Sequence, residues 1–126
     1  MQKGVELLAH FNAKALTDYF MLDENTDFGI LVPIVNEFVS SYDTYLTSLQ
    51  ENLITKNYQS IQQTAHSLKS SSRLLGLEII GELCAKIEED AAQKKCDPKY
   101  VEELVKVSPT SIGELQNHIK LHVKQG

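Results

Sequence analysis

Apolar residues recur every three or four positions along most of the chain, and no segment alternates strictly between apolar and polar residues. A three-to-four spacing gathers side chains on one face of an α-helix, whereas a half-buried strand needs a period of two. The clearest stripe comprises Leu31, Val35, Phe38, Tyr42, Tyr45, Leu49 and Leu53. The pattern predicts an all-α protein.

Five helical segments are expected. They cover about residues 5–22, 28–54, 58–75, a segment directly after Gly76 that includes Ile80–Ala91, and 97–123. Pro33 implies that the second helix either begins later than Phe28 or is kinked in its first turns, and Pro109 leaves the fifth either kinked or split. Short turns favour antiparallel neighbours, so the predicted fold is a four-helix bundle with an additional N-terminal helix against one end.

Polar residues mark several of the predicted helix ends. The cluster 23–27 supplies a loop and an N-cap, and Asp97–Pro98 resembles an N-cap followed by a first helical position. Ser111 and Glu114 have the spacing of a capping box, which predicts a helix start near Thr110. Together with a length of 126 residues, these boundaries describe one domain over 1–126.

Composition narrows the possible partners and compartments. The net charge is −5 and there is no run of five basic residues, so nucleic acid is not an expected partner. No apolar run approaches the length of a membrane span and no signal segment is present, so we expect a cytoplasmic protein away from the membrane. Cys84 and Cys96 form no CxxC pair, which argues against a disulfide framework or structural zinc.

One helical face gathers unusual chemistry around His66. On a helical wheel, the polar residues within about 60° of His66 are Gln59, Gln62, Lys69, Ser70 and Arg73. Ile61, Thr64, Leu68 and Leu75 occupy the opposite side. This predicts an exposed histidine rather than one buried in the core. The remaining plain interpretation is an ordinary solvated surface without a joint role.

Chemistry favours a role for this face. A neutral imidazole is a nucleophile near physiological pH, and Lys69, one turn away, would stabilise an anionic group attached to the ring. Arg73 extends the positive strip by another turn. The face carries no Asp or Glu between Gln59 and Arg73, so a hydrolytic triad is not predicted, and no Gly-rich phosphate loop is present for ATP. A histidine that receives a group from another molecule fits best.

A second histidine pattern suggests a metal site. His118 and His122 are spaced i, i+4, with Glu114 one turn earlier, which can place three ligands on one helical face. No further ligand lies nearby in the sequence, so a solvated helix face is the favoured interpretation and no metal site is expected. His10 shows no pattern of its own.

The residues around His66 resemble a known motif. Residues 65–76, AHSLKSSSRLLG, are similar to the AHxLKGSSxxLG phosphorylation motif of histidine phosphotransfer (HPt) domains, and residues 83–88, LCAKIE, are similar to the LCxxLE segment that follows it. The resemblance extends over about residues 30–95. It implies a four-helix bundle whose exposed His66 accepts a phosphoryl group from the aspartyl phosphate of a receiver domain, on Nε2, and passes it to another receiver's aspartate.

The resemblance also assigns roles and partners. It implies that Lys69 neutralises the phosphoryl group, that Gln59, Gln62, Ser70 and Arg73 belong to the partner-docking face, and that the carrier has no kinase or phosphatase activity of its own. Mg²⁺ would be bound by the partner receiver and not by this chain. The expected partners are receivers of response regulators or hybrid sensor histidine kinases, bound by a monomer.

The sequence departs from the motif at Ser70, where the family usually has glycine and a partner approaches closely. Ser71 and Ser72 are expected to be small packing residues, and Gly76 to permit the turn after the helix. One alternative function stays open, a module that docks receivers without transferring phosphate. Donor, acceptor, pathway and direction of transfer are not identified by the sequence, although Met1 and the modest length favour a free-standing protein over a piece of a hybrid kinase.

Overall fold

The computed structural model describes residues 8–22 and 27–123. Within these ranges it contains helices and no strands, which confirms the predicted all-α class. The elements are α1 (Lys14–Phe20), the 3₁₀ turn η2 (Phe28–Leu31), α2 (Val32–Thr55), α3 (Tyr58–Leu74), α4 (Glu78–Ala92) and α5 (Pro98–His122). None of these helices is long and apolar enough to cross a membrane.

Side-chain caps fix the starts of three of these elements. The Asp27 carboxylate accepts the Gly29 N–H at 2.8 Å and so begins η2, and Asn57 accepts the Ser60 N–H at the start of α3. Asp97 accepts the Lys99 N–H before α5. Pro33 lies in the first turn of α2, where its missing N–H costs nothing, so α2 begins later than Phe28. The rest of the predicted cap cluster, 23–26, lies outside the described residues.

Helix α5 continues through Pro109 and is not split. The Ser108 hydroxyl donates to the Leu104 carbonyl, one turn earlier, and is hydrogen-bonded to the Tyr42 hydroxyl of α2. These contacts attach α5 to α2 where the proline interrupts its own hydrogen bonds. Ser111 is fully buried inside the helix, so the predicted capping box and helix start near Thr110 are wrong.

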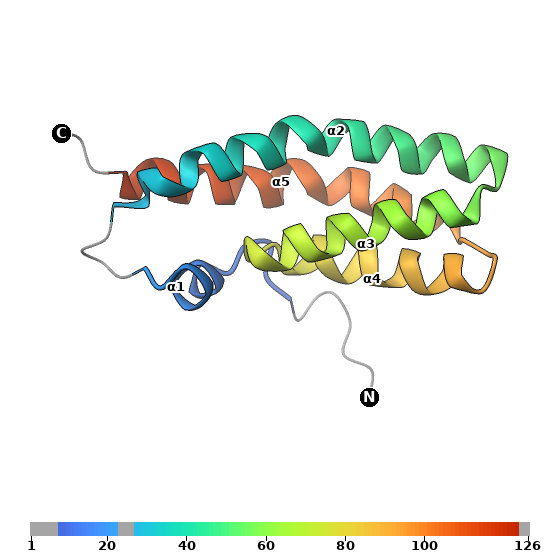
Figure 1. Cartoon of the computed structure of the whole chain (residues 1–126), viewed down its shortest axis with the longest axis horizontal. Coiled ribbons are helices and arrows are strands. Elements are labelled where there is room, and N and C mark those ends of the chain that lie inside the picture. Colours follow the sequence, from blue (N-terminus) through green and yellow to red (C-terminus); the bar gives the residue numbers. More distant parts are fainter. Residues whose placement is uncertain (1–7, 23–26, 124–126) are drawn as a thin grey trace.

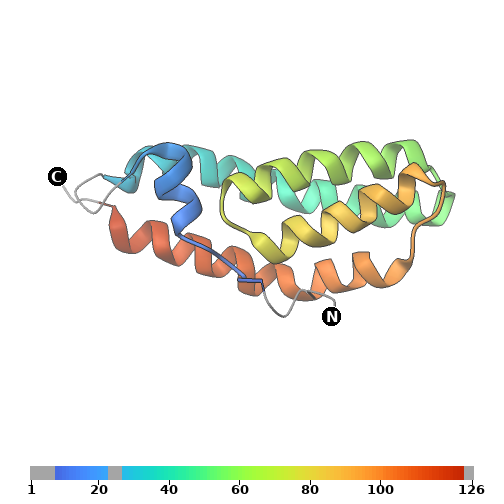
Figure 2. The ribbon, with the colours of Figure 1, turned by 90° about the horizontal axis from the view of Figure 1, so that it is seen from below.

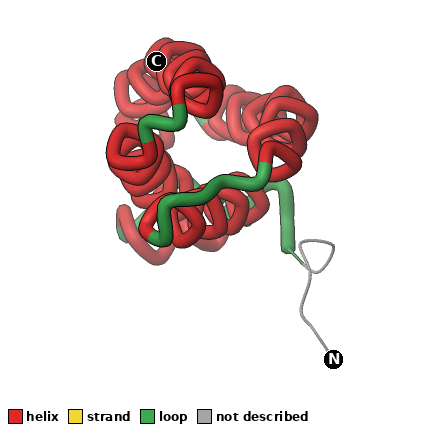
Figure 3. The backbone as a smooth tube through the Cα atoms, turned by 90° about the vertical axis from the view of Figure 1, so that its right-hand side faces the viewer, coloured by secondary structure: helices red, strands yellow, loops and turns green. Residues whose placement is uncertain are grey.

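Helices α2 to α5 form the predicted antiparallel bundle (Figure 1). An end-on view shows the four helices around a common axis (Figure 3). Each contributes fully buried side chains to one core, including Leu49, Leu68, Ile80 and Leu104. The predicted stripe of α2 is largely buried, but Tyr45 is 37% exposed, because it faces a shallow groove between α2 and α3.

The N-terminal segment, residues 8–22, lies across one side of the bundle (Figure 2). Its helix begins only at Lys14, so the prediction of helix from residue 5 is wrong for 8–13, and 5–7 lie outside the described residues. The Asn12 N–H donates to the Gly76 carbonyl at 2.8 Å, and the Ile79 N–H donates to the Ala9 carbonyl at 3.2 Å. These backbone groups bond to the α3–α4 turn instead of to a helix of their own.

Gly76 allows this contact. Its φ of +78° is in the left-handed region, which non-glycine residues rarely adopt. A Cβ added there would lie 2.3 Å from the Asn12 carbonyl oxygen. The predicted role of Gly76 in the turn is therefore confirmed, and the close approach of Asn12 adds a second requirement for glycine.

Candidate functional site

Helix α3 divides its residues between the core and the surface as predicted. Ile61 and Leu68 are fully buried, whereas the His66 side chain is 62% exposed. Because these positions alternate with the helical period, the burial of the apolar face directs His66 away from the core. The predicted presentation of the imidazole is confirmed.

A carboxylate from α4 holds the His66 ring. Glu88 Oε2 lies 2.6 Å from His66 Nδ1, and Glu88 Oε1 lies 2.5 Å from Lys69 Nζ. The Glu88 and Lys69 side chains are only 19% and 22% exposed, so the bridge is sheltered beside an exposed imidazole. One carboxylate thus fixes both the ring and the ammonium group.

Ionisation of Glu88 sets the tautomer of the ring. Hydrogen bonding to Lys69 lowers the pKa of Glu88 below its usual value, hydrogen bonding to His66 adds to this, and partial burial opposes it. An ionised carboxylate can only accept hydrogen bonds, so Nδ1 carries the proton that it donates to Glu88. In the neutral ring, Nε2 then keeps its lone pair. The geometry presents Nε2 as the nucleophilic atom.

Sequence reasoning missed the role of Glu88, although the residue ends the LCxxLE-like segment. The signal lies in the hairpin formed by α3 and α4. His66 and Glu88 are each eleven residues from Leu77, and Arg73 and Gly81 are each four residues from it. An antiparallel pair that turns at Leu77 brings both pairs side by side. That register was not available from the helical wheel of α3 alone.

The predicted positive strip is partly neutralised by α4. Lys69 is paired with Glu88, and Arg73 Nη2 lies 4.0 Å from Glu82 Oε2. The Arg73 stem crosses α4 at Gly81, where an added Cβ would lie 3.0 Å from Arg73 Cγ. Both cations therefore stay near the His66 face, but neither stands there as an unpaired charge.

The remaining predicted site residues lie on the same face without contacting the imidazole. Gln59 and Ser70 are exposed and Gln62 is half-buried. Glu88 therefore orients the ring, and a docking role for Gln59, Gln62 and Ser70 stays a prediction. Ser72 is fully buried, as a packing residue should be, but the same prediction is wrong for Ser71, which is exposed and borders the α2–α3 groove.

The second histidine pattern has a different setting from the one expected. His118 is half-buried, and its ring stacks on that of His122 with centroids 4.2 Å apart, so the predicted solvated face is wrong for His118. Phe11 contacts the His118 ring, and Phe28 contacts both rings. In 8–22 and 27–123, no three His, Cys, Asp or Glu side chains are grouped to hold a metal ion.

Comparison with known proteins identifies the fold and the motif together. The family model for the Hpt domain matches residues 33–121, which is well over half of the chain. No curated protein and no solved structure matches the chain significantly. The match spans α2 to α5 and includes His66, Lys69 and Glu88. The chain therefore belongs to the Hpt domain family, whose members take part in phosphotransfer in phosphorelays.

Proposed function

We propose that this chain is a phosphoryl carrier that accepts a phosphoryl group on His66 Nε2 from an aspartyl phosphate of a receiver domain and passes it to another receiver's aspartate. The observation that carries the proposal is the exposed imidazole whose Nδ1 is held by Glu88, 2.6 Å away. An exposed nucleophile on a rigid helix can enter a partner's active site, which a buried histidine could not do.

The contacts of His66 fit the charge changes of the transfer. The Nε2 lone pair forms the N–P bond while the P–O bond to the donor carboxylate breaks, and that carboxylate leaves with the electron pair. The ring becomes positively charged in this step because Nδ1 keeps its proton. Glu88 accepts the hydrogen bond from Nδ1, so its negative charge stabilises the imidazolium as it forms. The reverse sequence returns the phosphoryl group to an aspartate.

The local charges favour chemistry shared with a partner. Lys69 and Glu88 form an ion pair, so together they leave little net positive charge for the phosphoryl oxygens. Phosphoryl transfer depends on neutralising these oxygens and on positioning. We propose that Mg²⁺ bound in the receiver supplies much of this neutralisation, with Lys69 contributing from this chain. The carrier then needs no ATP site and no kinase or phosphatase activity of its own.

The same assignment suggests the partners of the protein and the compartment in which it acts. The proposed partners are receivers of response regulators or hybrid sensor kinases, bound by a monomer. The shallow groove between α2 and α3 is lined by Ser71, the neighbour of Ser70 in the sequence, and offers Ile34 and Tyr45 as apolar contacts for them. Cys84 and Cys96 are unpaired, which fits a reducing compartment such as the cytoplasm.

Incubation with phosphorylated receivers tests the proposal against docking alone. A panel of receivers carrying labelled aspartyl phosphate is mixed with the chain in the presence of Mg²⁺. Transfer predicts an acid-labile, alkali-stable label on the chain that a second receiver removes. Binding of receivers without any label would instead support the docking module.

Replacing Glu88 with alanine should slow transfer by roughly tenfold or more, because Nδ1 loses the acceptor that fixes the ring and its tautomer. The Nε2–H tautomer of His66 should gain population. Imidazole ¹⁵N chemical shifts measure the tautomer, and the rate of label transfer measures the chemistry.

Neighbouring substitutions provide the controls for this prediction. Glu89 is the adjacent residue on α4 but is exposed, so Glu89→Gln should leave both the rate and the tautomer unchanged. Glu88→Gln keeps an oxygen acceptor without the charge and should give an intermediate rate. Equal rates for Glu88→Ala and wild type would remove Glu88 from the mechanism.

Ser70→Leu should slow transfer far more than it lowers stability. Ser70 is exposed one turn from His66, where the family usually has glycine, so a larger side chain would obstruct the receiver without disturbing the core. Transfer rates and urea unfolding of the same samples separate the two effects. Ser70→Gly should transfer at least as fast as wild type, and an unimpaired Ser70→Leu protein would show that steric access at this position is unimportant.

A further inference from the structure

The three histidines other than His66 all lie where the N-terminal segment and η2 meet α5. His10 Nδ1 is 2.7 Å from the hydroxyl of Ser111, which is buried in α5. His118 and His122 stand on successive turns near the end of α5. The contact therefore joins segments far apart in sequence through imidazole rings.

Aromatic rings complete this contact. Phe28 of η2 stacks on His122 with ring centroids 5.1 Å apart and lies 5.6 Å from His118. Phe11 of the N-terminal segment lies 5.2 Å from His118. Phe28 is only 3% exposed, His118 is half-buried and His122 is exposed, so the cluster lies at the edge of the core. Neutral imidazoles pack in such a cluster, whereas adjacent imidazolium ions repel each other across the 4.2 Å between the stacked histidines.

Several charged residues lie on the described elements around the pair. Burial, and secondly the neighbouring His122, lower the pKa of His118. Glu114, one turn earlier on α5, is exposed, and the Asp27 carboxylate of η2 accepts the Gly29 N–H. Lys120 adds positive charge to the same end of α5, and His122 Nδ1 lies 2.9 Å from the His118 carbonyl oxygen. Burial and the neighbouring His122 thus disfavour protonation of His118 while the contact is formed.

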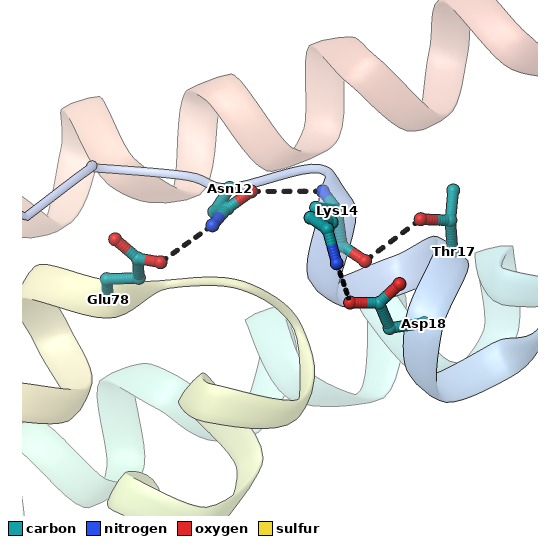
Figure 4. A network of polar contacts seen from close by, with 5 residues as sticks. All are labelled: Asn12, Lys14, Thr17, Asp18 and Glu78. Atoms are coloured by element: carbon teal, nitrogen blue, oxygen red, sulfur yellow. Dashed lines mark hydrogen bonds and ion pairs between the residues drawn. The ribbon is translucent and has the colours of Figure 1, made fainter.

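A second attachment of the N-terminal segment uses a carboxylate instead. Glu78 of α4 accepts a hydrogen bond from the Asn12 side chain at 2.8 Å (Figure 4) and another from the Ala9 N–H at 3.0 Å. The Asn12 bond, and then the Ala9 bond, lower the pKa of Glu78. The charges of α1 on this segment, Lys14 and Asp18, pair with each other. The attachment to α4 therefore persists at pH values where imidazoles gain protons.

We propose that the cluster formed by Phe11, Phe28, His118 and His122 is a pH-sensitive latch, which holds Phe11 and Phe28 on the end of α5 when both imidazoles are neutral and opens on mild acidification. The attachment of Ala9 and Asn12 to α4 stays closed. Phe11 and Phe28 are thus released from the end of α5 while the segment stays attached to α4.

The direction of the pH response follows from the protonation of His118. A histidine with a lowered pKa in the folded protein stabilises the contact fully above its ordinary value of about 6.5. That contribution is lost as the pH falls through the lower value of the folded state. Glu78, a carboxyl with a lowered pKa, contributes above its own ordinary value and loses its contribution only in more acidic solution. Mild acid therefore separates the two attachments.

Proton NMR of the whole chain tests the latch at about pH 7.5 and about pH 5.5, on either side of the ordinary histidine value. We expect nuclear Overhauser contacts between Phe28 and the rings of His118 and His122 at the higher pH and their loss at the lower. Hydrogen exchange, corrected for its intrinsic pH dependence, should show that the Asn12 and Ile79 amides keep their protection at both. Ring contacts that persist at the lower pH would overturn the proposal, as would simultaneous loss of the Asn12 and Ile79 protection.

Three variants separate the latch from other pH effects. His118→Phe keeps a ring but takes up no proton, so the Phe28 contact with His122 should survive acidification. His118→Gln is also uncharged, and its contacts should be equally independent of pH even if they are weaker. His66→Gln removes a histidine outside the latch and should respond as wild type does. A wild-type response in either His118 variant would overturn the assignment.

Discussion

His66→Gln should abolish labelling by every phosphorylated receiver while leaving the free energy of unfolding within about 0.5 kcal/mol of wild type. Glutamine has no nitrogen nucleophile that could replace Nε2. The His66 side chain is 62% exposed and fills no part of the core, so its loss removes chemistry without removing packing. Label transfer and urea unfolding measure the two quantities on the same protein.

A matched histidine substitution locates the label. His122→Gln also removes one imidazole, but at the end of α5 and away from Glu88. At neutral pH it should accept label as wild type does. Label that persists in His66→Gln would place the acceptor elsewhere and would end the carrier proposal. Normal labelling of His122→Gln, with none on His66→Gln, would assign the acceptor to His66.

Gly76→Ala should lower the free energy of unfolding by roughly 2–4 kcal/mol. The left-handed backbone at φ +78° disfavours any side chain, and a Cβ would lie 2.3 Å from the Asn12 carbonyl oxygen. The clash is with backbone, so relief requires the N-terminal segment to move away from the α3–α4 turn. Urea unfolding measures the loss, and faster exchange of the Asn12 amide would locate it.

Gly113 provides the opposite case on the same chain. It lies inside α5, and a Cβ there would meet nothing within 4 Å. Gly113→Ala should therefore raise the free energy of unfolding by roughly 0.5–1 kcal/mol through the better helix propensity of alanine. Similar losses for the two substitutions would contradict the specific roles of the Gly76 backbone and the Asn12 contact.

Local periodicity was sufficient for most of the bundle. The apolar stripe of α3 predicted the burial of Leu68 and the exposure of His66. The same reasoning failed where contacts between distant segments override local preference. The Ala9 carbonyl and the Asn12 N–H bond to the start of α4 and to the α3–α4 turn instead of forming a helix, and α5 passes Pro109 without a break beside the Tyr42 contact.

The sequence by itself determined the helices and the exposed His66, because a stripe with the 3.6-residue period decides which face of a helix leaves water. Only the tertiary structure decided what meets that face. Glu88 reaches His66 because α3 and α4 are antiparallel about Leu77. His118 meets Phe28 because η2 lies against the end of α5. Such contacts depend on the register between segments, which the period within one helix does not contain.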